Sequence, residues 1–174
     1  VMFKTVFGND KFNFTYNGIT FLGCASGPYV RMSDGHIPRD AVNWLDTTLK
    51  NLKKGQPIIF LNHYPIDNSL DNWYEVTDRL RKFNTWAILC GHGHANKAFN
   101  FEDIPGVMGR SNLRAKQEEV GYNLVDVTHD SILFTTRKPV SGQEKTWTGI
   151  KINKDGYDQN KKFVRPDYSF NKKY

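Results

Sequence analysis

The chain has 174 residues and a mass of 20.1 kDa, a length that fits one domain or part of one. Its hydrophobic fraction of 39%, together with 14 glycines, is ordinary for a globular protein and excludes a wholly disordered, collagen-like or coiled-coil chain. The formal net charge is +6, and two cysteines are too few for a disulfide scaffold or a four-ligand zinc knuckle.

A hairpin and then a helix are expected in the first third of the chain. Residues 12–16 alternate between aromatic and polar side chains, an Asn-Gly pair follows at 17–18, and residues 19–24 are mostly apolar. This order predicts two antiparallel strands joined by a tight turn. Beginning with a proline, apolar residues then recur every three or four positions, which predicts an amphipathic helix over 38–52 that ends near Gly55.

The middle third predicts a β-strand, a helix and a second β-strand, joined by short connections. Residues 57–61 and 86–90 are apolar runs, and between them apolar residues recur with helical spacing over 70–83. Such a βαβ unit makes the two strands parallel and buries them on both faces. Their carboxyl ends therefore lie at one edge of the sheet, where open α/β folds bind their ligands.

Three histidines follow these two strands. His63 comes two residues after the first strand, and His92 and His94 come two and four residues after the second. Neighbouring strands lie about 4.8 Å apart, so we expect the imidazoles to converge, with the glycines around His92 letting the turn bend closely. Neutral imidazole suits Zn, Fe, Mn or Ni better than Mg or Ca. We therefore predict a metal site, with a hydrogen-bonded turn that carries incidental histidines as the alternative.

The last third predicts further strands and a polar connection. Glycine-containing connections and a polar stretch lead into a second hairpin over 122–134, and residues 146–152 are expected to add another strand. In the polar stretch, Arg110, Asn112 and Arg114 are candidate substrate contacts, because arginine binds phosphate through two parallel hydrogen bonds. A surface loop without such a role is the alternative.

The end of the chain is basic. Residues 151–174 hold seven Lys and Arg against three Asp, which supplies +4 of the net charge, whereas residues 1–150 contribute +2. Together with the polar composition, this predicts a folded portion over 1–150 and a basic polar tail, or a linker to a further C-terminal domain, over 151–174. No apolar run approaches the roughly 20 residues that span a bilayer, so no membrane span is expected.

The two histidine segments together resemble those of a known family. Asn62-His63-Tyr64-Pro65 after the first strand and Cys90-Gly91-His92-Gly93-His94 after the second resemble the last two motifs of the calcineurin-like metallophosphoesterases. Segments 7–22 and 35–52 also resemble the region between the third and fourth motifs of that family. The resemblance covers residues 7–137 of the chain.

The resemblance implies a fold, a cofactor and an activity. The family fold is a sandwich of two β-sheets flanked by helices, and this α/β chain would be the C-terminal half of that αββα sandwich. His63 and His92 match ligands of one metal ion and His94 matches a ligand of a second, both divalent transition-metal ions such as Mn, Fe or Zn. Family members hydrolyse phosphoric esters, because two such ions activate a bridging hydroxide and bind the phosphoryl oxygens.

The first three motifs of the family, an Asp-x-His, a Gly-Asp and a Gly-Asn-His, are missing from the sequence. They would supply the bridging carboxylate and further ligands, so we expect the C-terminal portion of a longer phosphoesterase rather than a truncated relative that has lost its chemistry. Its partners would be a phosphoester substrate and the missing N-terminal half of the domain, roughly 100 upstream residues. The fragment alone is expected to bind metal weakly and to hydrolyse little.

Two other functions stay open. The chain could be a non-catalytic binding or scaffold module, or a metal-dependent nuclease whose basic tail contacts phosphates, although nucleic acid is not the expected partner. A serine hydrolase has no support, since the sequence lacks a Gly-x-Ser-x-Gly turn. The residues leave the substrate, the metal and the compartment unassigned.

Overall fold

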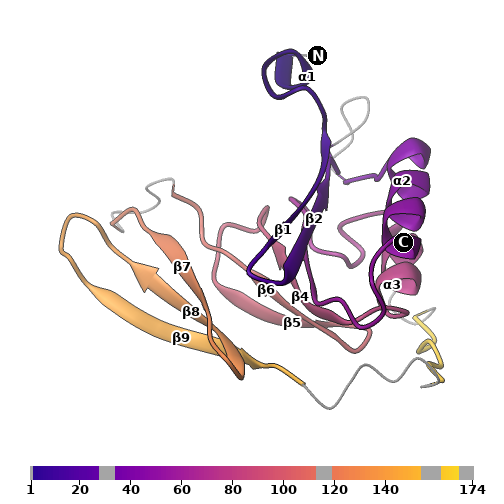
Figure 1. Ribbon diagram of the computed structural model, residues 1–174. Coiled ribbons are helices and arrows are strands. Elements are labelled where there is room, and N and C mark those ends of the chain that lie inside the picture. Colours follow the sequence, from indigo (N-terminus) through magenta and orange to yellow (C-terminus); the bar gives the residue numbers. More distant parts are fainter. Residues whose placement is uncertain (1, 28–33, 113–118, 154–161, 169–174) are drawn as a thin grey trace.

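A computed structural model of the protein describes residues 2–27, 34–112, 119–153 and 162–168. Its first sheet has six strands in the order β1-β2-β3-β4-β6-β5, and its second sheet has three in the order β7-β8-β9 (Figure 1). The strands are β1 (Lys11–Tyr16), β2 (Ile19–Cys24), β3 (Ile58–Leu61), β4 (Thr85–Cys90), β5 (Lys97–Phe101), β6 (Ile104–Met108), β7 (Tyr122–Val127), β8 (Ser131–Arg137) and β9 (Glu144–Lys151). The helices are α1 (Met2–Phe7), α2 (Arg39–Lys50) and α3 (Trp73–Leu80).

The first sheet has a parallel centre and two antiparallel ends. Strands β2, β3, β4 and β6 run parallel, and the hairpins β1–β2 and β5–β6 form the ends. The predicted hairpin over 12–24 is confirmed, and its turn residues Asn17 and Gly18 have φ angles of 51° and 80°, as a tight hairpin turn requires. The predicted βαβ unit is also confirmed, because β3 and β4 pair in parallel with α3 between them in the chain.

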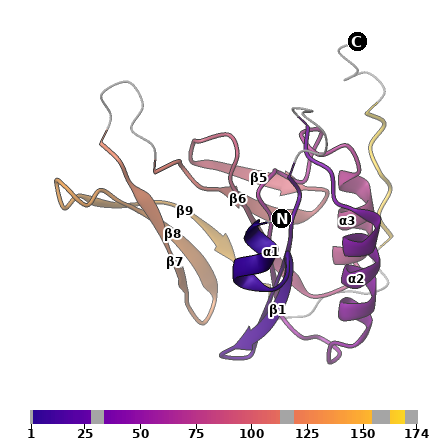
Figure 2. The ribbon, with the colours of Figure 1, turned by 90° about the horizontal axis from the view of Figure 1, so that it is seen from above.

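Three layers build the fold. Helices α2 and α3 cover one face of the first sheet, and the second sheet lies against the opposite face (Figures 1 and 2). Alternate side chains of each central strand therefore enter one of two cores. The core under the helices includes Leu22, Leu45, Ile58, Phe60, Leu80 and Ile88, and the core between the sheets includes Ile19, Ile59, Val107, Ile132, Phe134 and Ile150.

Part of the predicted secondary structure was incomplete. The sequence predicts only connections between residues 95 and 109, but β5 and β6 occupy this segment and place β6 beside β4. The apolar spacing also predicts a second amphipathic helix over 70–83, whereas α3 spans only Trp73–Leu80. The expected strand over 146–152 is confirmed as β9, which pairs with β8.

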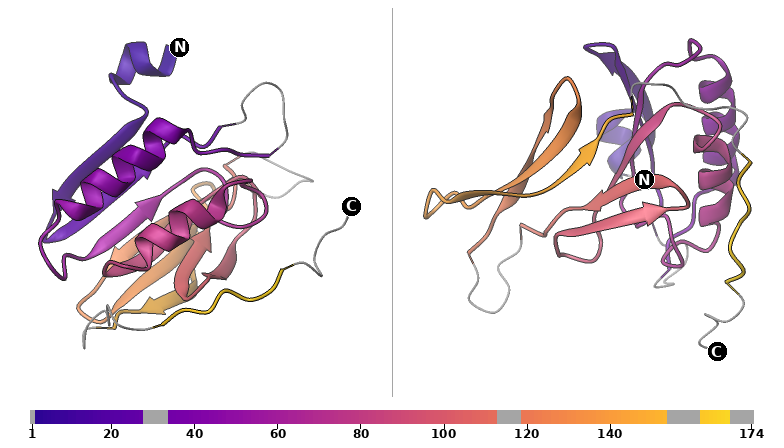
Figure 3. Two further views of the ribbon diagram at one scale, coloured as in Figure 1. Left: turned by 90° about the vertical axis from the view of Figure 1, so that its right-hand side faces the viewer. Right: turned by 90° about the horizontal axis from the view of Figure 1, so that it is seen from below.

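Residues 162–168 pack against α3 and the β5–β6 turn. Arg165 donates from Nε to Oε1 of Glu102 over 2.8 Å, and its NH2 group lies 2.6 Å from Oδ1 of Asp78. The ring of Tyr168 meets the ring of Trp73 edge to face, with 5.5 Å between centroids. In the right view of Figure 3 this segment, drawn in yellow, runs beside the helices. The domain boundary near residue 150 stays a prediction. No helix in the described ranges is long and apolar enough to cross a membrane.

Candidate functional site

The turns after β3 and β4 leave the same edge of the first sheet. Leu61 at the end of β3 pairs with Leu89 near the end of β4, and beyond this pair the two turns are joined by backbone hydrogen bonds. The amide of Asn62 donates to the carbonyl of Leu89 over 3.0 Å, and the amide of Gly91 donates to the carbonyl of His63 over 2.9 Å. Parallel pairing therefore places the histidine segments side by side.

The imidazoles of His63 and His92 come together at this edge. Their ring centroids lie 5.5 Å apart, the ring planes are nearly perpendicular at 81°, and both side chains are exposed to solvent. Partial burial, followed by repulsion from His92 and His94, lowers the pKa of His63 below its ordinary value of 6.5. His94 is therefore close enough to influence His63, and the three predicted ligands occupy one neighbourhood.

A buried tyrosine supports the two rings from below. The ring of Tyr64 lies 4.1 Å from that of His92 and 5.3 Å from that of His63, measured between centroids. Tyr64 also packs against Gly35, where a Cβ atom would come within 2.6 Å of the tyrosine ring. The sequence gives only one local signal of this support, an aromatic residue inside the first histidine segment.

Asn62 fixes the backbone of the same turn. Its side-chain Nδ2 donates to the carbonyl of Tyr64 over 2.7 Å, which holds the residues on either side of His63. The Oδ1 atom of Asn62 is buried and accepts no hydrogen bond from the described residues. A buried acceptor without a donor is costly, so this atom marks a place where a further donor would be stabilising.

The second histidine turn has an unusual backbone. His92 and His94 have φ angles of 71° and 57°, in the left-handed region where residues other than glycine are uncommon, although histidine occurs there more often than most. The sequence predicts positive φ at the glycines that flank His92, but the structure has it at the histidines themselves. Gly93 lies close to the end of the Met108 side chain, which would have to move aside for a Cβ atom at 2.7 Å. Backbone strain of this kind persists where the surrounding structure enforces it, and it clusters at functional sites.

The loop after His94 is connected to the second sheet through Asn96. Its Oδ1 atom accepts hydrogen bonds from the backbone amide of Arg110 at 3.0 Å and from the side chain of Asn123 at 2.9 Å. Its Nδ2 atom donates to Thr136 over 2.7 Å. The side chain of Asn96 therefore joins the histidine loop, the chain after β6 and the strands β7 and β8. No pattern in the sequence singles out this residue.

The predicted substrate contacts have different positions. Arg110 is half-buried, and its NH2 group donates to the backbone carbonyl of Glu119 over 2.9 Å. Asn112 is exposed, and Arg114 lies outside the described residues. Their role in binding phosphate stays a prediction.

The described residues do not complete a binuclear metal centre. Imidazole nitrogens suit transition-metal ions, but a binuclear centre also needs a bridging carboxylate. Asp67 is the acidic residue nearest His63 in sequence, and its Oδ1 atom accepts a hydrogen bond from the backbone amide of Ser69 in its own turn. Within the ranges that the structure covers, no group of three or more His, Cys, Asp or Glu side chains is arranged to hold an ion. The role of His63, His92 and His94 as metal ligands stays a prediction.

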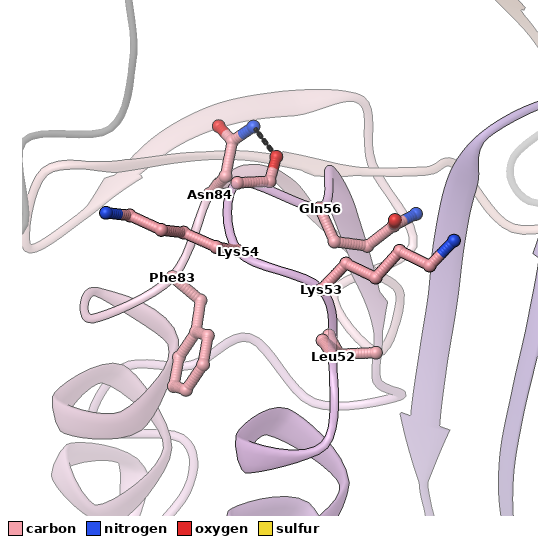
Figure 4. A pocket seen from close by; sticks show the side chains of 7 residues that line it. Leu52, Lys53, Lys54, Gln56, Phe83 and Asn84 are labelled. Atoms are coloured by element: carbon pink, nitrogen blue, oxygen red, sulfur yellow. Dashed lines mark hydrogen bonds between the residues drawn. The ribbon is translucent and has the colours of Figure 1, made fainter.

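A shallow pocket of about 200 Å³ lies at the other edge of the first sheet. Residues 52–56 and 83–84 line it, and Asn84 donates from Nδ2 to the carbonyl of Gly55 over 2.9 Å (Figure 4). These segments enter β3 and β4 at their amino ends, whereas the histidines follow the carboxyl ends. The pocket is therefore separate from the histidine edge.

Comparisons with known proteins identify the fold. No protein-family model matches the sequence, and a search of curated proteins finds no match. A solved dimetal phosphatase from Danio rerio is similar in structure, with a TM-score of 0.62 and 12% identity, over 86% of this chain and 63% of that chain. GAP50, the anchor in the inner membrane complex of Plasmodium, gives a TM-score of 0.53 and 16% identity, over 83% of this chain and 54% of that chain.

These neighbours establish the architecture and its extent. The chain has a mixed α/β fold with parallel and antiparallel strands, as in metallophosphoesterases, so the predicted fold class is confirmed. At such low identities the similarity shows the fold alone. The chain spans less than two thirds of the length of either neighbour.

Proposed function

We propose that this chain is the C-terminal half of a metal-dependent phosphoesterase that hydrolyses phosphoric esters at a binuclear centre. The observation that carries the proposal is the meeting of His63 and His92 at the carboxyl edge of a parallel sheet, with their ring centroids 5.5 Å apart. The fold shared with a dimetal phosphatase supports it. A stable core alone needs neither exposed, adjacent imidazoles nor the strained backbone of His92.

His63 and His92 would hold one divalent ion of Mn, Fe or Zn, and His94 would be a ligand of a second. Such ions lower the pKa of bound water and polarise phosphoryl oxygens. Tyr64 keeps the ring of His92 in place from the buried side. Arg110, with Asn112 and Arg114, would contact the phosphate of the substrate.

The remaining ligands would come from polypeptide outside this sequence. The described residues offer no bridging carboxylate beside the histidines, and the neighbours are longer than this chain. The buried Oδ1 atom of Asn62 lacks a donor among the described residues, which fits a site still open to a further segment. On this proposal the isolated chain is inactive.

A non-catalytic scaffold module is the second candidate. It is favoured by the incomplete set of ligands in the described residues and by the shared fold of GAP50, whose name describes an anchor. The nuclease alternative gains no comparable support, because Arg165 in the basic tail is already paired with Glu102 and Asp78.

Metal analysis and turnover separate the two candidates. The test compares this chain with the polypeptide extended by about 100 residues encoded upstream in the same frame. We expect the extended chain to bind about two transition-metal ions and to hydrolyse p-nitrophenyl phosphate. His92→Asn in the extended chain should lose both the metal and the hydrolysis. The control His129→Asn, which changes a histidine in the turn between β7 and β8, should lose neither. An extended chain without metal would favour the scaffold. Strong turnover by the 174-residue chain, abolished by His92→Ala, would contradict the fragment role.

A further inference from the structure

Three aromatic side chains of β1 form a row on one face of the first sheet. Phe12, Phe14 and Tyr16 alternate with polar residues and so point to the same side of the strand. We call these three residues the aromatic row. Their partners on β2 are Gly23, Phe21 and Ile19, respectively.

The aromatic row continues the core between the two sheets. Ile19 is buried in that core and Phe21 packs against it, and cross-strand partners lie on the same face of a sheet. The row therefore faces the side on which β7–β9 lie, opposite the helices. In the left view of Figure 3, β1 extends beyond the part of the first sheet that the second sheet covers.

The row is exposed although it lies on an interior face. Phe12 is 44% exposed, Phe14 54% and Tyr16 71%, and every residue of β1 after Lys11 is exposed. Monomeric proteins rarely leave a continuous aromatic surface on a sheet in contact with water, so such a surface indicates an interface.

The row has an ordered, flat shape. The rings of Phe14 and Phe21 stack with 5.0 Å between centroids and 12° between planes, and Phe12 stacks on Phe14 at 6.1 Å. The ring of Phe12 lies over Gly23, where a Cβ atom would come within 2.3 Å of it. A flat apolar surface beside an existing contact between sheets fits another sheet better than a helix or a small molecule.

We infer that the aromatic row is the docking surface for apolar β-strands that widen the second sheet until it covers β1. We further infer that these strands belong to the upstream polypeptide that completes the histidine site. This inference rests on the proposed function for the identity of the segment. Two observations select that occupant: the row is continuous with the contact between the sheets, and the two neighbours extend well beyond the part of their chains that this one matches.

Radical footprinting tests the inference on two chains, the 174-residue chain and the chain extended by about 100 upstream residues. We expect labelling of Phe14 to fall about fivefold in the extended chain, as a side chain goes from half-exposed to buried, whereas labelling of Tyr74 on α3, exposed to 45%, stays constant. Equal labelling of Phe14 in both chains would overturn the inference. So would protection that appears in the 174-residue chain as its concentration rises, because the occupant would then be a second copy.

Melting temperatures give a second readout. Phe14→Ser should lower the melting temperature of the extended chain by several degrees more than that of the 174-residue chain, because the ring, half-exposed and stacked on Phe21 in the shorter chain, becomes fully buried only in the longer one. Tyr74→Ser is the control and should shift both chains equally. Equal shifts for Phe14→Ser would overturn the inference. Protection of the row in an extended chain that binds no metal would leave the docking surface intact and reject the phosphoesterase.

Discussion

Replacing Glu102 by glutamine tests how residues 162–168 are held. The carboxylate is 3% exposed and accepts hydrogen bonds from Arg165 at 2.8 Å, Thr77 at 2.7 Å and Arg81 at 2.5 Å. Glu102→Gln keeps the size of the side chain but removes the buried one of the two anions that Arg81 and Arg165 share, so that only the more exposed Asp78 still pairs with both. Removing one partner of a buried ion pair costs about 3–5 kcal/mol, and the partial exposure of Arg165 reduces this to about 2–3 kcal/mol.

The assay is thermal unfolding of the 174-residue chain. For a chain of this size each kcal/mol corresponds to about 2–4 °C, so the melting temperature should fall by about 5–10 °C. Glu144→Gln is the matched control, since its carboxylate forms an exposed ion pair with Arg137 at 3.0 Å and should matter by less than about 1 kcal/mol. Equal melting temperatures for the two variants would refute the reasoning.

The effect should also depend on pH. Burial alone raises the pKa of Glu102, but the hydrogen bonds from Arg165, Thr77 and Arg81 outweigh it and hold the pKa below its ordinary value of 4.5. Because the folded pKa is lower than the unfolded one, the stabilisation is fully present above about pH 4.5 and is lost as the pH falls through the folded value. The difference in stability between the wild type and Glu102→Gln should therefore be constant from pH 7 to 5 and shrink below.

Three further predictions concern the histidine edge and the core. Gly35→Ala should displace the ring of Tyr64 and destabilise the chain by about 1–3 kcal/mol. Because that ring lies against His92, the imidazole NMR signals of His92 should shift, and unchanged signals would contradict the packing of Tyr64 between Gly35 and His92. Partial burial and repulsion from His92 lower the pKa of His63, so in metal-free protein the imidazole signals of His63 should titrate below pH 6.5. The free energy of unfolding should therefore decrease as the pH drops from 6.5 through the lowered pKa. His92→Asn should raise the pKa of His63, and an identical titration in the variant would count against the pairing. Burial raises the pKa of the Cys24 thiol to about 12, so a thiol reagent at pH 8 should label it only after unfolding, and rapid labelling of the native chain would be inconsistent with this burial.

The parallel centre of the fold could be predicted from the sequence. Strands buried on both faces are continuous apolar runs, as in residues 57–61 and 86–90, and the helix between them has a periodic apolar face. Once the two strands are parallel, the meeting of His63 and His92 follows from topology. This part of the candidate site required no knowledge of side-chain packing.

Strands β5 and β6 could not be predicted in the same way. Lys97–Phe101 holds no β-branched residue, and β6 contains Pro105 and Gly106, which weaken a strand pattern. Gly106 is nevertheless needed, because a Cβ atom there would lie 2.2 Å from the ring of Phe101. The contact between paired strands, rather than local preference, decides this segment.

The supports of the site were also hidden, because they join residues far apart in the sequence. Tyr64 touches Gly35 across the site, and neither residue belongs to a periodic pattern. Arg165 reaches Glu102 from a segment whose composition resembles a solvated tail. Composition and periodicity describe neighbours along the chain, so contacts of this kind emerge only from the folded structure.

The shared amide of Asn96 has a consequence for how the molecule responds to ligands. One side chain holds the loop beyond His94, the backbone of Arg110 and the strands β7 and β8, so none of these can shift without disturbing the others. A ligand that bound only the native imidazoles would stabilise this whole assembly by mass action. Its binding should therefore slow amide exchange in β8, on the far side of the sandwich, as well as at the rim that it touches.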